Sequence, residues 1–207
     1  DAGKILGGGS GNGVRGLFAG GRPSSNTDRI EYLTVATTGN TTDAGDLTRA
    51  VGYFSPNANV APGRMVGMMS FDTDFTNKDF NYVAIMSTDD AADFGDSQVA
   101  GVECSPIGLS ESRNVWAWGK DGSSFEVTME YLNPSTLSDT TDFGDLQTCA
   151  NSSAGKHTNG TRGEVWGAAQ GDGVDVQYIT IASTGDATNA GEIRTGKRST
   201  WDGWSGD

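Results

Sequence analysis

One stretch of the 207-residue chain occurs four times, and this repetition constrains the fold more than any other feature. In every copy a tyrosine lies 13 residues before a glycine, and an arginine opens each unit at a spacing of 49 residues. Such a period, held over four copies, is typical of an array in which each repeat is one supersecondary unit. The repeated residues are Arg15, Arg64, Arg113 and Arg162, then Tyr32, Tyr82, Tyr131 and Tyr178, then Gly45, Gly95, Gly144 and Gly191.

Each unit divides into pieces that favour β-structure. The residues after the arginine, such as RGLFAGG from Arg15, predict a short strand of apolar and small residues. The tyrosine segment, such as 30–35, is apolar on both faces, which predicts a strand covered on both sides. The Asp-Ala-Gly-Asp segment predicts a turn, in which the first aspartate caps the backbone and the glycine takes a positive φ. A fourth, less regular strand fits before the next arginine.

Composition agrees with an all-β fold. Glycine is abundant at 31 residues, and no long stretch has apolar residues at helical spacing. Three or four short strands per unit of about 49 residues predict a β-propeller-like array of four units, with a β-solenoid as the alternative. We expect one repeat domain over 1–207, with units of about 1–47, 48–97, 98–146 and 147–193 and a tail at 194–207. The sequence leaves open whether four units close a ring or belong to a longer array.

The charge of the chain limits its partners. A formal net charge of -13 repels nucleic acid and anionic membranes, so neither is an expected partner. No apolar run approaches the ~18 residues of a membrane-spanning helix. The first residues lack the basic and apolar regions of a signal peptide, although a leader removed by cleavage is compatible with this. Cys104 and Cys149 fall at different places in their repeats, and we expect two buried thiols in preference to one disulfide.

The unit resembles kelch-type propeller repeats. The likeness consists of Arg15 with Gly20-Gly21, the strand with Tyr32, and an outer turn before the next arginine. The double glycine is present only in the first unit, and the tryptophan that follows the tyrosine in kelch repeats is missing. The resemblance implies a divergent kelch-like fold. Copper-radical oxidases of this type need two histidines at the metal, and this chain has only His157.

A closer likeness is to glycine-rich, propeller-like repeats in virion proteins of marine tailed phages. It is carried by GLFAGG, by ATTGNTTDAGDLT at 36–48 and by ASTGDATNAGEI at 182–193. The resemblance implies a non-enzymatic component of the virion surface, in a tail fibre or a decoration, whose partners are other virion proteins, copies of itself or a host-surface glycan. A secreted carbohydrate-binding module is the alternative, and a glycan-cleaving hydrolase is the third hypothesis.

The four repeated arginines are candidate binding residues. In a ring they would lie at one height and could hold an anionic glycan. The structural interpretation, which we favour, pairs each arginine with turn carbonyls and with an acid that follows the repeated glycine, and so joins neighbouring units. The four acids concerned are Asp46, Asp96, Asp145 and Glu192.

The other candidate residues have ordinary structural interpretations. Asp72 with Asp74 and Asp172 with Asp175 offer oxygen ligands for calcium, but neither pair has the ligand order of an EF-hand, so no metal or cofactor is expected. His157 lies in a polar loop without a nucleophile motif, so we expect no catalytic triad. Trp116, Trp118 and Trp166 fit a core position. Trp201 and Trp204, in a glycine-rich tail, are candidates for a contact surface.

Overall fold

The computed structural model describes residues 7–59, 61–70, 76–101, 104–121, 124–149, 155–166, 175–193 and 203–205. These residues form an all-β fold of antiparallel sheets, as the sequence predicts. No helix occurs in these ranges, and so none that is long and apolar enough to cross a membrane.

Each repeat forms one four-stranded sheet whose strands pair in chain order, apart from a small hairpin in the third repeat. The first sheet contains β1 (Gly8–Gly11), β2 (Arg15–Ala19), β3 (Thr27–Thr34) and β4 (Thr42–Val51). The second contains β5 (Tyr53–Asn59), β6 (Arg64–Ser70), β7 (Asp79–Ala84) and β8 (Ala92–Asp96). The third contains β9 (Ser105–Leu109), β10 (Asn114–Ala117), β13 (Thr128–Leu132) and β14 (Thr141–Asp145), and β11 (Lys120–Asp121) pairs with β12 (Ser124–Phe125) beside it. The fourth contains β15 (Gly155–Thr158), β16 (Arg162–Trp166), β17 (Asp175–Thr180) and β18 (Thr188–Glu192).

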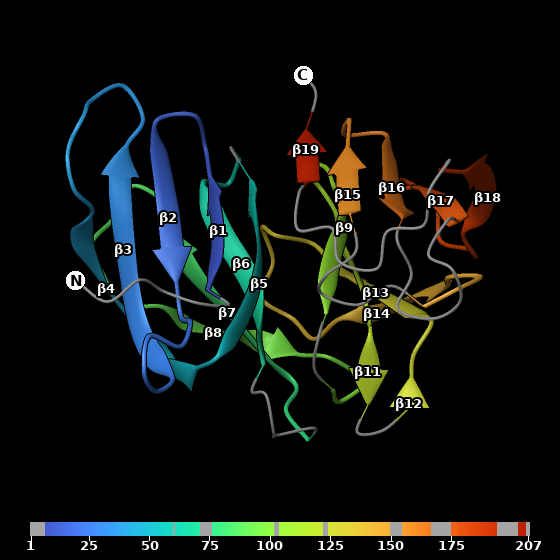
Figure 1. Cartoon of the computed structure of the whole chain (residues 1–207), viewed down its shortest axis with the longest axis horizontal. Coiled ribbons are helices and arrows are strands. Elements are labelled where there is room, and N and C mark those ends of the chain that lie inside the picture. The colour runs from blue at the N-terminus through green and yellow to red at the C-terminus, as the bar shows by residue number, and fades with distance from the viewer. Residues whose placement is uncertain are drawn as a thin grey trace.

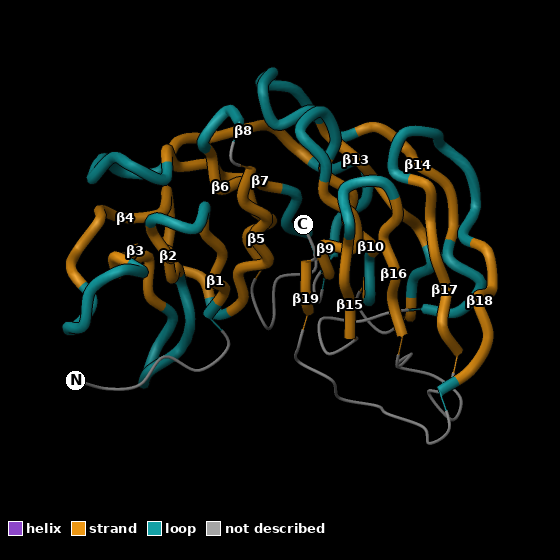
Figure 2. The backbone as a smooth tube through the Cα atoms, turned by 90° about the horizontal axis from the view of Figure 1, so that it is seen from above, coloured by secondary structure: helices purple, strands orange, loops and turns teal. Residues whose placement is uncertain are grey.

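The four sheets follow one another along an open arc (Figures 1 and 2). Seen from above, β1, β5, β9 and β15 line the inner side of the arc, and β4, β8, β14 and β18 lie on the outer side (Figure 2). The first and fourth sheets stand at opposite ends, so the described strands do not close a ring. The short strand β19 (Gly203–Ser205) pairs in parallel with β15 and makes the fourth sheet five-stranded.

A separate apolar core fills each space between consecutive sheets. The first core includes Leu17 and Ile30 from the first sheet and Met65 from the second. The core between the second and third sheets includes Trp116, and the core between the third and fourth sheets includes Phe143. In the tyrosine strand β13, Met129, Glu130 and Leu132 are buried, which confirms a strand covered on both faces. All four residues of the neighbouring strand β10 are buried as well. This explains why the strands lack the alternating polar face of a sheet that meets water on one side.

The Asp-x-Gly-Asp segment is a strand with a bulge, not the turn predicted from the sequence. It forms the outermost strand of each sheet, and opposite the tyrosine strand one residue is extra, as where Ile30 pairs with Gly45 and Glu31 with Asp43. The predicted local features are present within it: Gly45 has a φ of 106°, and its N–H donates to Oδ1 of Asp43 over 2.9 Å. The bulge turns the extra residue inward, which buries Ala44 and, in the next two sheets, Phe94 and Phe143.

Candidate functional site

Each repeated arginine is stacked on the tyrosine of its own repeat, and the first three arginines lie between consecutive sheets. The guanidinium carbon is 4.0 Å from the ring centre in the Arg15–Tyr32 pair and 4.3 Å in the Arg113–Tyr131 pair. The pairs form because the two residues lie on neighbouring antiparallel strands, where diagonal side chains are within reach. Such stacking contributes roughly 0.5–2 kcal/mol, more when water is excluded. The remaining pairs are Arg64 with Tyr82 at 4.8 Å and Arg162 with Tyr178 at 3.9 Å.

Three of these arginines also donate a hydrogen bond to the following sheet. Nη1 of Arg15 donates to the carbonyl of Ser87 over 3.0 Å, Arg64 to that of Pro134 over 3.2 Å, and Arg113 to that of Ile181 over 3.0 Å. The predicted link between units is therefore present for these three through turn carbonyls. The prediction that carboxylates pair with these arginines is wrong. In the described part of the chain, no ion pair joins the arginines to the acids that follow the repeated glycines.

Replacing Arg64 by alanine should lower the melting temperature. The variant loses a stack on Tyr82 and a charge-assisted hydrogen bond to the next sheet, together about 2 kcal/mol, which is roughly 4–8 °C for a chain of this length. Arg162→Ala is the matched control, since Arg162 has the same stack but is exposed. Differential scanning calorimetry compares the two. Equal losses in both variants would contradict a role for the carbonyl contact between sheets.

A second contact joins the outer strands of neighbouring sheets through the backbone. The residue after the repeated glycine donates its N–H to an aspartate of the next repeat and accepts a backbone N–H from the residue that follows that aspartate. In the first pair of sheets, Asp46 N–H donates to Oδ1 of Asp90 over 3.0 Å, and Ala91 N–H donates to the Asp46 carbonyl over 2.8 Å. The same pair of bonds joins Asp96 to Asp139 and Thr140, and Asp145 to Asp186 and Ala187.

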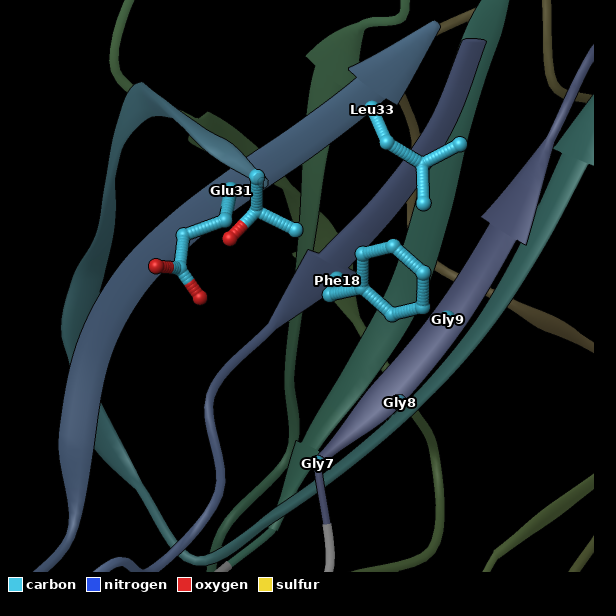
Figure 3. A pocket seen from close by; sticks show the side chains of 7 residues that line it. Gly7, Gly8, Gly9, Phe18, Glu31 and Leu33 are labelled. Carbon is cyan, nitrogen blue, oxygen red and sulfur yellow. The ribbon is translucent and has the colours of Figure 1, made fainter. Parts of the chain in front are cut away.

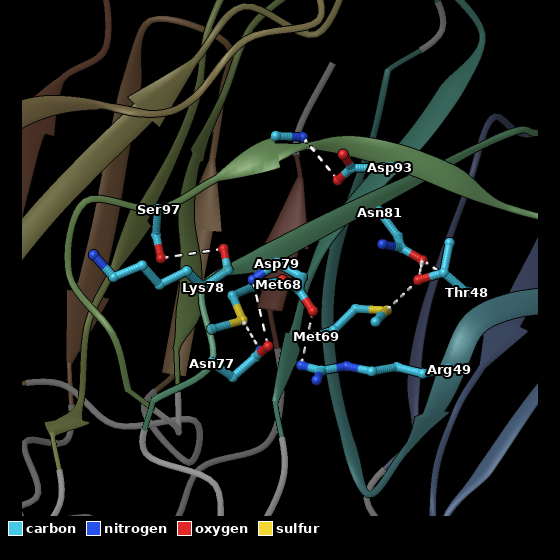
Figure 4. A network of polar contacts seen from close by, with 11 residues as sticks. Thr48, Arg49, Met68, Met69, Asn77, Lys78, Asp79, Asn81, Asp93 and Ser97 are labelled. Carbon is cyan, nitrogen blue, oxygen red and sulfur yellow. Dashed lines mark hydrogen bonds and ion pairs between the residues drawn. The ribbon is translucent and has the colours of Figure 1, made fainter.

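A third contact uses the residue just before each tyrosine. Asn81, Glu130 and Gln177 are each at most 2% exposed, although they are polar. Oδ1 of Asn81 accepts the N–H and the hydroxyl of Thr48 in the preceding sheet, over 3.0 and 2.8 Å (Figure 4). The carboxylate of Glu130 and the amide of Gln177 accept the corresponding backbone N–H groups of Gln98, Val99, Gln147 and Thr148. A buried polar group is stable only with such partners.

Sequence reasoning missed this third set because the residue at this position changes from one repeat to the next. The readable signal is that an amide or carboxylate precedes every tyrosine in an otherwise apolar strand, beginning with Glu31. The acceptor aspartates were missed for a related reason. They lie five residues before the glycine, where the first repeat has Asn40.

The inner strands are joined by short polar side chains. Nδ2 of Asn59 donates to the carbonyl of Ser110 in the next sheet over 2.7 Å, and Nδ2 of Asn114 donates to Oδ1 of Asn59 over 2.8 Å. The hydroxyl of Ser55 donates to the carbonyl of Cys104 over 2.6 Å. These bonds join the inner edges of the second and third sheets, and the hydroxyl of Thr158 donates to the carbonyl of Leu109 between the third and fourth sheets over 3.3 Å.

Carboxylates crowd together at the outer edge of the arc. Partial desolvation and the charges of Asp28, Asp90 and Asp43 raise the pKa of Asp46. Desolvation and the charges of Asp79, Asp139 and Asp93 raise the pKa of Asp96 in the same way. The folded state therefore disfavours the ionised form of both groups relative to the unfolded chain.

We expect Asp96→Asn to raise the melting temperature modestly at pH 7. An acid whose pKa is raised on folding binds its proton more readily in the folded state, so its ionisation lowers stability as the pH rises through that pKa. Below that pKa the wild-type carboxyl is itself neutral, and the advantage of the amide disappears. Melting curves of both proteins from pH 3 to pH 8 test this. An advantage for the variant that is equally large at pH 3 would contradict the electrostatic explanation.

The remaining candidates from the sequence are placed as follows. Trp116 and Trp118 are fully buried, in agreement with a core role, whereas Trp166 is half-buried and meets the ring of His157 edge-on. Nδ1 of His157 lies 3.5 Å from Glu164. Cys104 and Cys149 are buried thiols, as expected.

The calcium and tail candidates fall mainly on residues that are not described. Asp72, Asp74, Asp172 and Trp201 lie outside the described residues, and Trp204 is described only through the backbone of β19. Asp175 accepts a hydrogen bond from the hydroxyl of Thr148 over 3.3 Å. Within the described ranges, no three His, Cys, Asp or Glu residues are grouped so that they could hold a metal ion.

The fold, but not the sequence, is similar to that of a known protein. No family model and no curated protein matches the sequence. Among solved structures, that of YjhT is similar, with a TM-score of 0.72 over 94% of this chain and 67% of that chain, at 7% sequence identity. At this identity the likeness concerns the fold alone.

Proposed function

We propose that the protein is a non-enzymatic structural module, built as a propeller-like array of four kelch-like units that form an arc. The observation that carries this proposal is the use of the repeated polar side chains. Three of the four arginines, the three acceptor aspartates and the residues before the last three tyrosines make contacts between sheets. Side chains engaged in this way stabilise an array, in which each repeat contacts only its neighbours. They are not available as a catalytic constellation.

The place of such a module is the surface of a phage particle, in a tail fibre or a decoration. Support comes from the likeness of segments 36–48 and 182–193 to repeats of marine phage virion proteins. The net charge of -13 suits an exposed component that must not adsorb to nucleic acid. Mass spectrometry of virions purified from a lysate of the encoding phage tests this proposal. Recovery of the protein only from the soluble fraction would contradict it.

Carbohydrate binding is a second candidate function, because one variable loop presents an aromatic ring to solvent. The hairpin β11–β12 projects at one edge of the third sheet (Figure 1), and its Phe125 is 38% exposed. Nζ of Lys120 lies 5.7 Å from the centre of that ring. An exposed ring beside a cation is suited to stack on a sugar and to attract an anionic group.

A glycan array tests the second candidate and separates it from hydrolysis. Binding of a glycan, its loss in Phe125→Ala and recovery of the uncleaved glycan by mass spectrometry would support a binding module. Leu137→Ala is the matched control, since Leu137 is an exposed apolar residue of another loop in the same repeat. Release of shortened glycans by the wild-type protein would contradict both non-enzymatic candidates.

A further inference from the structure

The open face of the first sheet carries apolar residues whose counterparts in the other repeats are buried. Val35, three residues after the tyrosine, is 57% exposed, whereas Ile85 and Ile181 at the same repeat position are at most 1% exposed. Phe18, three residues after the arginine, is 38% exposed, whereas Trp116 and Val165 at that position are at most 2% exposed. The residues on this face are therefore of the kind that packs between two sheets in the other repeats. The described strands form no further sheet on this side (Figure 2).

The same face is hollowed (Figure 3). A cavity of about 450 Å³ lies over β1, β2 and β3, and it is lined by Phe18, Leu33, Glu31, Thr41 and the backbone of Gly7 to Gly9. In the other three repeats, the position of Leu33 is taken by Val83, Leu132 and Ile179, each of which is buried against the preceding sheet. The cavity thus marks the place where side chains of a preceding sheet would pack.

The fourth sheet presents the complementary half of the contact. Arg162 stacks on Tyr178 as the other arginines do, but it is exposed, whereas Arg15, Arg64 and Arg113 are half-buried beneath the following sheet. Glu192 follows the bulge glycine, at the position where Asp46, Asp96 and Asp145 exchange two backbone bonds with the next repeat. One chain therefore carries both halves of an interface that it already forms three times internally.

We propose that the first sheet of one copy receives the fourth sheet of a second copy, in a head-to-tail contact that repeats the internal interface. Arg162 of one molecule then donates to the carbonyl of Val35 in the other, as Arg113 does to the carbonyl of Ile181. Asn40 accepts the N–H of Glu192, as Asp186 accepts that of Asp145. Such a heterologous contact builds rings or filaments, not closed two-fold dimers. The proposal does not depend on the virion role.

The strand β19 opposes this association. Consecutive inner strands contact one another along the arc, from β1 to β5, β9 and β15, whereas β19 pairs with β15 within the fourth sheet and covers its inner edge. In the proposed contact, the β1 strand of an incoming copy would lie beside β15, where β19 restricts its approach. Deletion of 203–207 should therefore strengthen the association several-fold.

Sedimentation velocity over a wide concentration range tests the proposal. The wild-type protein should associate at high concentration, and more strongly at 0.5 M than at 0.1 M NaCl, because salt screens the repulsion between two copies of charge -13. Val35→Lys and Tyr178→Lys should each abolish association, and Leu137→Lys should leave it unchanged. Far-UV circular dichroism and the melting temperature verify that each variant is folded.

A mixing experiment decides the geometry. Val35→Lys keeps an intact fourth sheet and Tyr178→Lys keeps an intact first sheet, so a mixture of the two monomeric variants should form a one-to-one heterodimer. Association of Tyr178→Lys alone would show a contact of first sheet with first sheet and would overturn the proposal. A wild-type protein that stays monomeric, and in which Val35→Lys only lowers the melting temperature, would also overturn the proposal. That result would mean that the face is covered by residues 1–6 of the same chain, where Asp-Ala-Gly matches the repeated segment. Weaker association after deletion of 203–207 would also overturn it.

Discussion

Gly144→Ala should destabilise the protein by about 4 kcal/mol, a large effect for a single added methyl group. Gly144 has a φ of 133°, a backbone conformation that L-residues rarely adopt. A Cβ at this position would also lie 2.5 Å from both the carbonyl carbon and the oxygen of Gly185 in the fourth sheet. The obstacle is backbone and cannot rotate away, so the third and fourth sheets must separate. Urea unfolding measures the loss.

Gly191→Ala separates the two causes of this effect. Gly191 holds the same place in the fourth repeat with a φ of 123°, but no atom of the described residues lies within 4 Å of the added Cβ. Its replacement should cost only the conformational part, about 1–3 kcal/mol. Equal losses in both variants would show that the close approach of consecutive sheets at Gly144 does not contribute to stability.

Glu130→Ala should destabilise the protein by roughly 3–5 kcal/mol. The carboxylate is 1% exposed and accepts the N–H groups of Gln98 and Val99, over 3.2 and 2.9 Å, and the hydroxyl of Thr140. Truncation removes this acceptor from the contact between the second and third sheets, so the Val99 N–H loses its partner. The other two donors keep only longer bonds, from the Gln98 N–H to Oγ1 of Thr140 and from the Thr140 hydroxyl to the carbonyl of Asp96. A buried donor left without its partner costs about 1–3 kcal/mol. Calorimetric unfolding of the variant measures the sum.

Glu130→Gln is the control that the protein itself provides. Gln177 occupies the same position in the fourth repeat, where Oε1 accepts the N–H groups of Gln147 and Thr148 over 2.6 and 3.2 Å. The amide variant should therefore remain within about 1 kcal/mol of the wild-type protein. A loss as large as that of the alanine variant would mean that the charge of Glu130, and not its acceptor geometry, stabilises the contact.

The order of the strands was predictable from the sequence, and the partners of the side chains were less so. The 49-residue spacing of the arginines and the apolar tyrosine segments predicted the strands after Arg15 and around Tyr32. The positive φ of Gly45 and the cap by Asp43 followed from general turn chemistry. The bulged strand was mistaken for a turn, because the same residues satisfy both structures locally and only pairing with the tyrosine strand distinguishes them.

The contacts between sheets were harder to predict because half of each contact is backbone. The sequence shows a repeated arginine and a repeated acid, which suggests an ion pair. Arg64 instead reaches the carbonyl of Pro134, and carbonyls leave no trace in a sequence. The stacking of arginine on tyrosine was readable in principle, because both residues repeat and lie on adjacent strands. The residue before the tyrosine changes from Asn81 to Glu130 to Gln177, so only its ability to accept a hydrogen bond repeats.

Backbone amide exchange tests the central claim most directly, namely that the same backbone contact between outer strands joins each consecutive pair of sheets. The N–H groups of Asp46, Asp96 and Asp145 donate to aspartates of the following sheet, whereas Glu192 holds the same position in the last sheet of the arc. In dilute protein, exchange measured by NMR should be at least about tenfold slower for the three aspartates than for Glu192. Equal exchange at all four amides would contradict the account.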